Sequence, residues 1–372
     1  MFTLLPRPAR VALPIALALA LAALGIAASG AMANSPRSVY TLTNDPAGNA
    51  VQVFKRNGHG SLSPRGEFAT GGAGTGTGLG NQGALALDGR RLFAVNPGSD
   101  SISSFEVRGH RLELIDTDPS GGDRPISLTV DDGLLYVLNA GGAGDISGHT
   151  ISRHGALSPL VGSTRPLSGG GADPAQVSFD PRGETLVVTE KATNLIDTYE
   201  VDGDTGLATG PNPQASAGAT PFGFAFDRRG HLIVSEAFGG ATDQSAVSSY
   251  EVDDGLIDPI SPSVGTTETA ACWIVVTKTG RFAYTSNTGS ASISGYRVSH
   301  AGALTLLDAD GQTGLTGPGP IDMALTRSNR FLYSLNSGDG TISGFRVKAD
   351  GGLAPIGRAS GLPAAATGLA AR

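Results

Sequence analysis

Two glutamates at matching places in neighbouring repeats are the side chains best suited to acid–base chemistry. Glu190 ends the apolar segment Val187-Val-Thr-Glu190, and Glu236 ends the matching segment one repeat later. Two carboxylates that converge on one cleft can raise the pKa of one of them and so produce a general base. A solvated position, or a pair between Glu190 and Lys191, is the alternative interpretation.

Asparagines occupy the matching position in the other five repeats. A ring of such oxygens can hold a hard cation such as Ca²⁺ or bind a polyhydroxylated ligand, and no metal is assigned. The competing interpretation is an Asx-turn, in which an asparagine after a strand bonds its own backbone. The five asparagines are Asn44, Asn96, Asn139, Asn287 and Asn336. We select Asn139, Asn287 and Asn336 as ligand-binding candidates.

Cys272 and Trp273 place a thiol beside an aromatic ring. No histidine maps nearby to generate a thiolate, so a buried cysteine and a packing tryptophan are the preferred interpretation. The sequence contains no H-x-x-x-H pair, no G-x-S-x-G elbow, no phosphate loop and no dinucleotide fingerprint. These absences argue against zinc, serine-hydrolase and nucleotide chemistry.

The elements that must position these side chains are seven copies of one unit. Phe331-Leu-Tyr-Ser-Leu-Asn336 and Thr341-Ile-Ser-Gly-Phe-Arg-Val347 are matched by Arg281-Phe-Ala-Tyr-Thr-Ser-Asn287 and Ser292-Ile-Ser-Gly-Tyr-Arg-Val298. The matched ends recur roughly every 40 to 50 residues, which is the propeller range. Each unit starts with an alternating apolar segment such as Pro221-Phe-Gly-Phe-Ala-Phe-Asp227, so four short strands fit per unit.

We therefore predict an all-β fold over residues 34–372, a seven-bladed β-propeller with four-stranded blades. The tail Ala364–Ala371 resembles the inner strand that is missing before Val39-Tyr-Thr-Leu42. N-terminal strands and a C-terminal strand are thus expected to complete one blade, which removes exposed sheet edges. Cys272 is the only cysteine, so no intramolecular disulfide can form. A solenoid or two smaller β-domains are the alternatives.

In a propeller, the loop that enters the inner strand lies on the same face as the loop after the second strand. This relation maps a second set of side chains to the face of the glutamates and asparagines. The mapped residues are Gln82, Arg124, Asp173, Gln176, Phe222, Cys272, Trp273 and Asp322. Of these, we predict that Gln176, Phe222, Trp273 and Asp322 bind ligand.

Residues 1–33 are predicted to be a secretory signal peptide. Arg7 and Arg10 precede an apolar run from Val11 to Ala28, and Ala31-Met-Ala33 supplies a cleavage site. An uncleaved membrane anchor is the alternative, because the run approaches the length of a span. Cleavage would leave a secreted or periplasmic protein without a membrane span. The net charge of −7 and the absence of a basic cluster in any segment argue against nucleic acid and anionic membrane as partners.

The stretch Val187-Val-Thr-Glu-Lys-Ala-Thr-Asn-Leu-Ile-Asp-Thr-Tyr-Glu-Val201 resembles the N-E-L-x-S-T-V-x-V-x-Y stretch of the propeller lactonase family. That family includes 6-phosphogluconolactonases and the fungal carboxymuconate lactonising enzymes. The resemblance extends over essentially all of residues 34–372 through the F-D-P-R-G and Y-x-x-N repeats. It implies a seven-bladed fold with a site on one face, and it places Glu190 on the family's acidic site residue.

The chain departs from this family pattern at two places. The family usually starts the blade of Glu190 with a P-R-H pattern, where this chain has Asp173-Pro-Ala-Gln176. The preceding blade usually opens with H-x-H, where this chain has Arg124-Pro-Ile-Ser127. The missing groups argue against phosphogluconolactone and carboxymuconate as substrates. The sequence is also similar to an exported bacterial subgroup of the family, through Ser235-Glu-Ala-Phe-Gly-Gly240 and Ala271-Cys-Trp273.

The leading hypothesis is an exported, monomeric lactone hydrolase. In it, Glu190, with Glu236, activates water, while Asn139, Asn287 and Asn336 orient a lactone ring or a cation. The alternative is a non-catalytic propeller of the cell envelope, which uses the same face to bind a ligand, a polysaccharide or a protein partner. Because function is carried by sites rather than folds, the resemblance alone does not choose between them.

Overall fold

The computed structural model describes residues 37–372. The predicted signal peptide, residues 1–33, lies outside the described residues. Within the described part, the only helix is a single 3₁₀ turn, η1 (Phe238–Gly240). No helix in that part is long and apolar enough to cross a membrane.

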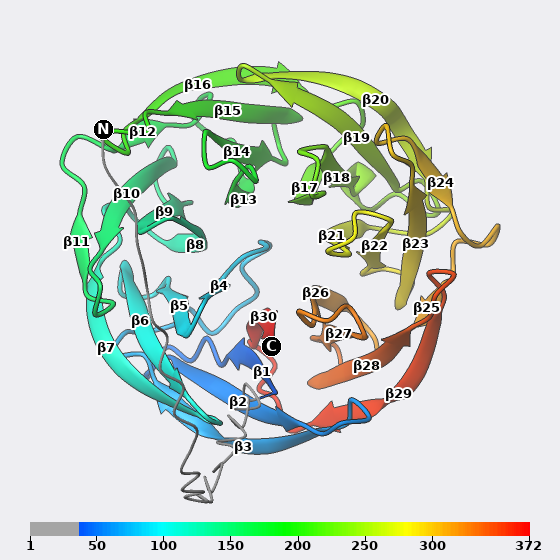
Figure 1. The fold of residues 1–372 in the computed structure, drawn as a ribbon, viewed down its shortest axis with the longest axis horizontal. Coiled ribbons are helices and arrows are strands. Elements are labelled where there is room, and N and C mark those ends of the chain that lie inside the picture. Colours follow the sequence, from blue (N-terminus) through cyan, green and yellow to red (C-terminus); the bar gives the residue numbers. More distant parts are fainter. Residues whose placement is uncertain (1–36) are drawn as a thin grey trace, which may run out of the picture. The chain divides into compact units, whose positions relative to one another are not determined.

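Seven antiparallel sheets surround a central axis, as the sequence repeats predicted (Figure 1). Each sheet is one blade, and its strands follow one another from the axis outward. Blade 1 contains β30 (Thr367–Ala371), β1 (Ser38–Leu42), β2 (Ala50–Arg56) and β3 (Leu62–Ala69). Blade 2 contains β4 (Leu85–Asp88), β5 (Arg91–Asn96), β6 (Ser101–Arg108) and β7 (Arg111–Pro119). Blade 3 contains β8 (Pro125–Asp131), β9 (Leu134–Asn139), β10 (Asp145–Ile151) and an outer strand divided into β11 (Leu157–Pro159) and β12 (Arg165–Pro166). Blade 4 contains β13 (Pro174–Phe179), β14 (Thr185–Glu190), β15 (Leu195–Val201) and β16 (Ala208–Ala215).

The remaining three blades follow the same plan. Blade 5 contains β17 (Pro221–Phe226), β18 (Leu232–Glu236), β19 (Ala246–Asp253) and β20 (Leu256–Gly265). Blade 6 contains β21 (Ala271–Val276), β22 (Phe282–Asn287), β23 (Ser292–Val298) and an outer strand divided into β24 (Leu304–Leu306) and β25 (Gly314–Leu315). Blade 7 contains β26 (Pro320–Leu325), β27 (Phe331–Asn336), β28 (Thr341–Val347) and β29 (Leu353–Ser360).

The place of a strand within its blade explains its composition. Second strands lie between neighbouring blades and are covered on both faces, and β27 is buried along its whole length. A strand covered on both faces carries a near-continuous apolar run. Outer strands face solvent, and β3 is exposed or half-buried at every residue. The apolar second strands therefore mark the packed middle of each blade.

Blade 1 joins the two ends of the described chain. Strand β30 pairs with β1 through Val39 and Ala371 and through Leu42 and Thr367. The backbone N–H of Arg372 also donates to the carbonyl of Ser38 at 2.8 Å. The predicted closure is thus confirmed. It leaves no unpaired inner edge on β1, which matters because edges invite pairing with other chains.

Neighbouring blades are joined by tyrosine hydroxyls that reach the next hairpin turn. Tyr136 donates to the carbonyl of Gly206 at 2.8 Å, and Tyr333 donates to that of Gly60 at 2.6 Å. Gly60 has a φ of +100°, and a Cβ there would clash with the side chain of Ile356. Only glycine fits this turn, because it alone adopts the conformation without a side chain.

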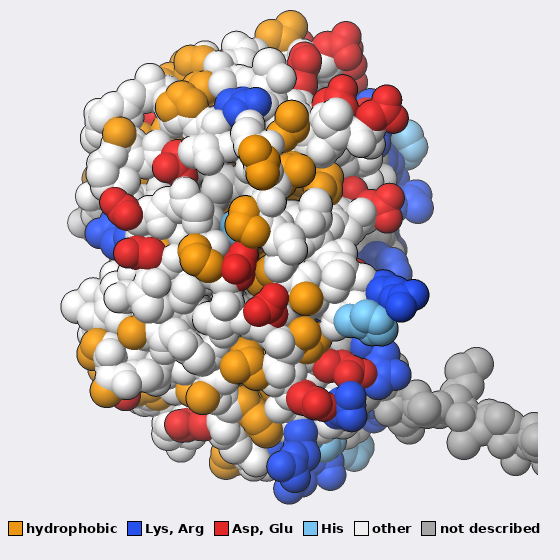
Figure 2. Space-filling view, turned by 90° about the vertical axis from the view of Figure 1, so that its left-hand side faces the viewer, with side chains coloured by type: hydrophobic (Ala, Val, Ile, Leu, Met, Phe, Trp, Pro, Cys, Tyr) orange, Lys and Arg blue, Asp and Glu red, His pale blue; other side chains and the backbone are white. Residues whose placement is uncertain are grey.

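The antiparallel strand order creates two different faces of the ring. We call the face with the starts of the inner strands and the ends of the second strands the site face. The opposite face, which we call the turn face, holds the turns between first and second strands and between third and fourth strands. Charged side chains are more numerous on the right-hand side of Figure 2 than on the left. The loops of the turn face are rich in charge, as in Asp88-Gly-Arg-Arg91 and Asp227-Arg-Arg-Gly230.

Candidate functional site

Four of the five predicted asparagines end a second strand and bond the third strand of their own blade. Asn44 is the exception, because it lies beyond the end of β1 and donates to Thr75 and Thr77. Nδ2 of Asn287 donates to the hydroxyls of Ser292 and Ser294 at 2.9 and 2.8 Å. Asn336 makes the same pair of bonds to Thr341 and Ser343, both at 2.9 Å. These amides are fully buried and link two strands.

Asn139 follows the same pattern in blade 3. Its Nδ2 donates to Asp145 at 2.8 Å and to Ser147 at 3.0 Å. The Oδ1 atoms of Asn139, Asn287 and Asn336 are buried without a hydrogen-bond partner among the described residues. Their amide nitrogens are therefore committed within each blade, and their amide oxygens are enclosed by the protein.

Glu190 is fully buried at the end of β14 and accepts bonds from nearby loops. Ser168 donates to it through its backbone N–H at 2.9 Å and through its hydroxyl, and Thr193 donates through its hydroxyl. Glu190 also faces Asp197 of β15. Burial raises the pKa of Asp197 to about 8, and Glu190 adds to the effect. Burial opposes ionisation of Glu190 too, but the bonds from Asp197, Ser168 and Thr193 outweigh it and lower the Glu190 pKa.

Glu236 occupies the matching place in blade 5 and is equally buried. It accepts hydrogen bonds from the hydroxyls of Ser248 and Ser263 and, at 2.9 Å, from the backbone N–H of Gly218. Burial raises its pKa, and these donors only partly offset the rise. Glu190 and Glu236 therefore each bond within their own blade and the adjoining loop. Their carboxylates are not presented together at an open surface.

The segment from Gly78 to Gln82 lies close to the axis (Figure 1) and makes hydrogen bonds to blades 1, 3, 4 and 6. Asn81 receives the Nε1–H bond of Trp273 at 2.6 Å and donates to Ile126. The backbone N–H of Gln82 donates to the carbonyl of Ala175 at 3.0 Å. The side chain of Gln82 pairs with both backbone groups of Ile274, at 2.8 and 2.9 Å. This segment therefore occupies space that the inner strands surround.

Gln176 and Asp322, two of the predicted ligand-binding residues, have structural partners. The side chain of Gln176 pairs with both backbone groups of Phe224 in the next blade, at 2.9 and 2.7 Å. Asp322 is buried and accepts the N–H of Met323 at 2.7 Å. Burial raises the Asp322 pKa well above its ordinary value. Both side chains satisfy backbone groups of inner strands.

Phe222 and Trp273 lie together on the site face beside Lys191. Their ring centroids are 4.9 Å apart. The ammonium of Lys191 lies 4.9 Å from the Phe222 centroid, donates to the carbonyl of Gly80 at 2.7 Å, and is 3.3 Å from a carboxylate oxygen of Asp173. We call Lys191, Asp173, Phe222 and Trp273 the lysine cluster. It combines a cation, a carboxylate and an aromatic floor.

Lys191 was considered from the sequence only as a partner of Glu190. Its side chain is 11% exposed, whereas that of Asp173 is 59% exposed. Burial lowers the pKa of Lys191, and Asp173 only partly offsets this. The signal available in the sequence was a lysine directly after a buried strand end. Its partners Gly80, Asp173 and Phe222 come from three other segments, so spacing did not reveal them.

Cys272 lies near the lysine cluster and is buried. Burial raises the pKa of its thiol to about 11, and the hydroxyl of Thr288 and the charge of Lys191 only partly offset this. The thiol is therefore protonated at neutral pH and is a poor nucleophile. Among the described residues, no group of three or more His, Cys, Asp or Glu side chains is placed to hold a metal ion.

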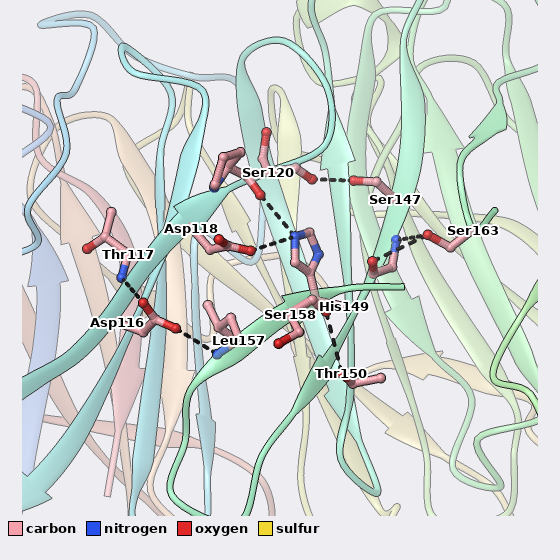
Figure 3. Close-up of polar contacts among 12 residues, drawn as sticks. Asp116, Thr117, Asp118, Ser120, Ser147, His149, Thr150, Leu157, Ser158 and Ser163 are labelled. Carbon is pink, nitrogen blue, oxygen red and sulfur yellow. Dashed lines mark hydrogen bonds and ion pairs between the residues drawn. The ribbon is translucent and has the colours of Figure 1, made fainter. Parts of the chain in front are cut away.

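A second polar cluster lies between blades 2 and 3 and surrounds His149 (Figure 3). Nε2 of His149 donates to the carbonyl of Pro119 at 2.9 Å and lies 3.8 Å from Asp118. A carbonyl only accepts, so Nε2 carries the hydrogen. Nδ1 is buried without a partner, and the imidazole is 1% exposed. The cluster is closed to ligands and joins two blades.

The fold is a seven-bladed propeller, and the lysine cluster is the candidate site that its inner strands bring together. The family model described as lactonase, seven-bladed β-propeller, matches residues 38–163 and 84–367. The chain belongs to this lactonase family, and the membership supports a lactonase-like function. No protein with a curated description matches the sequence.

Solved structures share the fold over nearly the whole chain. A Bacteroides fragilis protein, provisionally assigned as a 6-phosphogluconolactonase, is 21% identical over 92% of this chain and 99% of its own, with a TM-score of 0.71. A periplasmic gluconolactonase of Pseudomonas aeruginosa is 18% identical over 90% of this chain and 99% of its own, with a TM-score of 0.66. At these identities the likeness establishes the fold.

Proposed function

We propose that the protein hydrolyses a lactone at the lysine cluster on its site face. The observation that carries the proposal is the position of Lys191. This half-buried cation lies beside the exposed carboxylate of Asp173 and above the ring of Phe222. A chain of the lactonase family thus has, at one place, a cation that can stabilise negative charge and a carboxylate that can accept a proton.

The chemistry needs one water and no further reactant. Asp173 accepts a proton as the water oxygen attacks the lactone carbonyl carbon. Lys191 stabilises the negative charge that develops on the carbonyl oxygen, and a preorganised cation in a partly dry site is effective there. The ring C–O bond then breaks, its oxygen takes up the proton, and a hydroxy acid is released. The buried rings of Phe222 and Trp273 hold Lys191 in position from below.

Glu190 and Glu236, the bases predicted from the sequence, are retained as testable candidates. Their buried oxygens accept bonds from hydroxyls, so water activation by either would require these bonds to open. Asp173 is exposed without such a change. The roles predicted for Asn139, Asn287 and Asn336 stay predictions, as does a requirement for Ca²⁺.

The test is acid release from a panel of unphosphorylated aldonolactones and aromatic lactones, with and without calcium. We expect Asp173→Asn to lower kcat/KM by roughly 10²- to 10⁴-fold. We expect Lys191→Met to lower it by roughly 10²- to 10³-fold. Asp202→Asn and Lys278→Met, on the turn face, are the matched controls and should retain activity. Melting curves of all variants separate lost chemistry from lost folding.

The variants also decide between the candidate bases. If folded Glu190→Gln lost turnover while Asp173→Asn stayed fully active, Glu190 and not Asp173 would be the general base. Absence of turnover on every lactone in both conditions would overturn the enzyme proposal.

A non-catalytic binding propeller is the second candidate. The observation that favours it is the commitment of the asparagine and glutamate side chains to bonds within their own blades. Such a protein would bind a sugar or a lactone on the lysine cluster without turnover. Calorimetric titration with the same lactones would then show binding that Lys191→Met abolishes.

We also propose that the protein is exported and cleaved after Ala33. The sequence supports this, and one structural neighbour is described as periplasmic. The intact mass of protein recovered from the periplasm or the medium should correspond to a chain that starts at Asn34. A mass that includes residues 1–33 would contradict the proposal.

A further inference from the structure

Nine cationic side chains gather on the turn face over blades 6, 7 and 1. They come from loops and strand ends that are far apart in sequence, and all are exposed except the half-buried Lys55. We call them the basic sector. Its members are Lys278, Arg281, Arg297, Arg327, Arg330, Arg346, Lys348, Arg37 and Lys55. The sequence showed no basic cluster because no single segment contributes more than three of them.

The basic sector lacks neutralising partners. Across the described residues, no carboxylate lies within 4.0 Å of any of the nine cations. Elsewhere on this face arginines are paired, as Arg108 is with Glu106 at 2.8 Å and Arg182 with Asp180 at 3.2 Å. Asp350 is the one acidic side chain in the turn-face loops of blades 6, 7 and 1. Protein surfaces usually mix the two signs, so a field of one sign points to an anionic partner.

Aromatic rings hold several of these guanidinium groups in place. The guanidinium carbons of Arg281 and Arg297 each lie 5.4 Å from the centroid of Phe282, and that of Arg330 lies 5.5 Å from Phe331. Contact with a ring face stabilises a cation and limits its motion. The cations are thus kept near one another although like charges repel.

Repulsion from the basic sector also affects Arg56, which is buried at its edge. Burial lowers the pKa of Arg56, Tyr333 opposes the change, and the charges of Arg37 and Arg330 lower it further. A bound anion would relieve such repulsion. On the side of blade 2, Arg327 donates to the carbonyl of Gly89 at 3.4 Å. Gly89 borders a cleft of about 470 Å³ that is lined by Arg91 and Arg153 and also by the carboxylates of Asp88 and Glu106, so the field of one sign does not continue there.

We propose that the basic sector binds an acidic polysaccharide, a sugar chain that carries carboxylates. Arginine suits this ligand because its planar fork pairs with a carboxylate through two bonds. The partner is a chain and not a membrane, because blades 4 and 5 of the same face are acidic. A flat bilayer would meet both regions, whereas a chain can follow the cations alone. The acidic residues there are Glu184, Asp202, Asp204, Glu251, Asp253 and Asp254.

The surface does not suit nucleic acid equally well. Single-stranded nucleic acid is usually held by exposed aromatic rings on which bases stack. The large hydrophobic side chains exposed in the described part are Leu114, Val161, Leu256 and Leu315, and none is aromatic. Phe282 and Phe331 are buried beneath their arginines.

The test is a titration of the full protein with an oligogalacturonate of about ten units at low salt. The fully methyl-esterified oligomer serves as the uncharged control. We expect binding of the acidic form only, and weaker binding as salt rises, because salt screens exposed charges. The triple variant Arg281→Glu, Arg330→Glu, Arg346→Glu should weaken binding at least tenfold. Lactone turnover should be unchanged, since the sector lies on the face opposite the lysine cluster.

A matched variant tests whether position matters or only total charge. Arg165→Glu, Arg182→Glu, Arg228→Glu makes the same change of charge on blades 3, 4 and 5 and should alter affinity less than twofold. If the charge-reversed sector variant unfolds, the corresponding glutamine variant replaces it. Equal effects of the two triple variants would overturn the proposal, as would absence of binding. Equal or tighter binding to duplex DNA or to anionic phospholipid vesicles would assign the sector to that partner instead.

Discussion

Buried carboxyl groups in blade 4 couple the stability of the protein to pH. The pKa of Asp197 is raised from an ordinary 3.8 to about 8 by burial and by Glu190. Between these values the folded protein keeps a proton that the unfolded chain has released. The pair therefore favours folding at low pH, and this contribution is lost as the pH rises toward 8. The pKa of Glu190 is lowered from 4.5, so Glu190 is ionised in both states above pH 5 and does not alter the trend.

Replacing Asp197 with asparagine should flatten this dependence. The amide can still donate to Glu190 but releases no proton. We expect the decline in unfolding free energy between pH 5 and 8 to shrink by about 1 kcal/mol or more, since one pKa unit corresponds to roughly 1.4 kcal/mol. Urea unfolding at several pH values measures this decline, and Asp202→Asn, at an exposed position, is the control. If the unfolding free energy of Asp197→Asn changed with pH as steeply as that of the unmodified protein, Asp197 would not be the group that keeps the proton.

His149 should lower the stability of the protein at the acid end of the pH range. Burial lowers its pKa, and the bond to Pro119 and the charge of Asp118 only partly oppose this. The unfolded chain takes up a proton below about pH 6.5 that the folded imidazole refuses, so stability is lost as the pH falls through that value. His149→Gln keeps a donor for Pro119. Between pH 7 and 5.5 its unfolding free energy should fall by roughly 1 kcal/mol less than that of the unmodified protein. His300→Gln, in an exposed loop, should follow the unmodified protein.

At the scale of elements, side-chain amides extend the inner strands. Gln82 and Gln176 each pair with both backbone groups of a residue in another blade, Ile274 and Phe224. An amide side chain presents an N–H and a C=O side by side, as a backbone unit does, so it can take the place of a neighbouring strand. The contacts of Gln82 hold the segment from Gly78 to Gln82 near the axis and thereby hold Gly80 against Lys191.

Removing one of these amides should leave buried backbone groups without partners. We expect Gln82→Ala to lower the unfolding free energy by about 1 to 3 kcal/mol, the usual loss for such groups. Gln312→Ala, at an exposed loop position, should change it by less than about 0.5 kcal/mol. Urea unfolding at pH 7 compares the two. Equal, small losses would mean that other contacts hold the segment.

The strands could be predicted from the sequence because each repeat contains the same local pattern of residues. The ends of β5, β9, β22 and β27 coincide with the predicted asparagines, and closure by β30 followed from the spare C-terminal strand. The environment of the lysine cluster could not be predicted in this way. Lys191, Gly80 and Phe222 meet only after three blades close around the axis. Gln82 was mapped to the start of an inner strand, whereas it lies before β4 and crosses toward blade 6.

For the whole molecule, stability depends on the last strand. Leu369 of β30 is 7% exposed and packs in the core between blades 7 and 1. We expect Leu369→Ala to cost about 2 to 5 kcal/mol, the usual range for a buried leucine. Leu315→Ala removes the same atoms from a side chain that is 65% exposed and should cost less than about 0.5 kcal/mol. Thermal unfolding compares the pair, and similar melting temperatures would show that β30 is not needed to hold the ring.

The pairing of β30 with β1 also fixes when the ring can close during synthesis. A ribosome makes Thr367–Ala371 after all the other described strands, so the inner edge of β1 waits for its partner until blades 2 to 7 have been synthesised. Those blades can form in order, yet the circular arrangement is completed only by β30. A growing chain that cannot close early stays accessible to chaperones and to a translocation channel that accepts unfolded chains. The order of strands in blade 1 thus delays closure of the ring until β30 has been made.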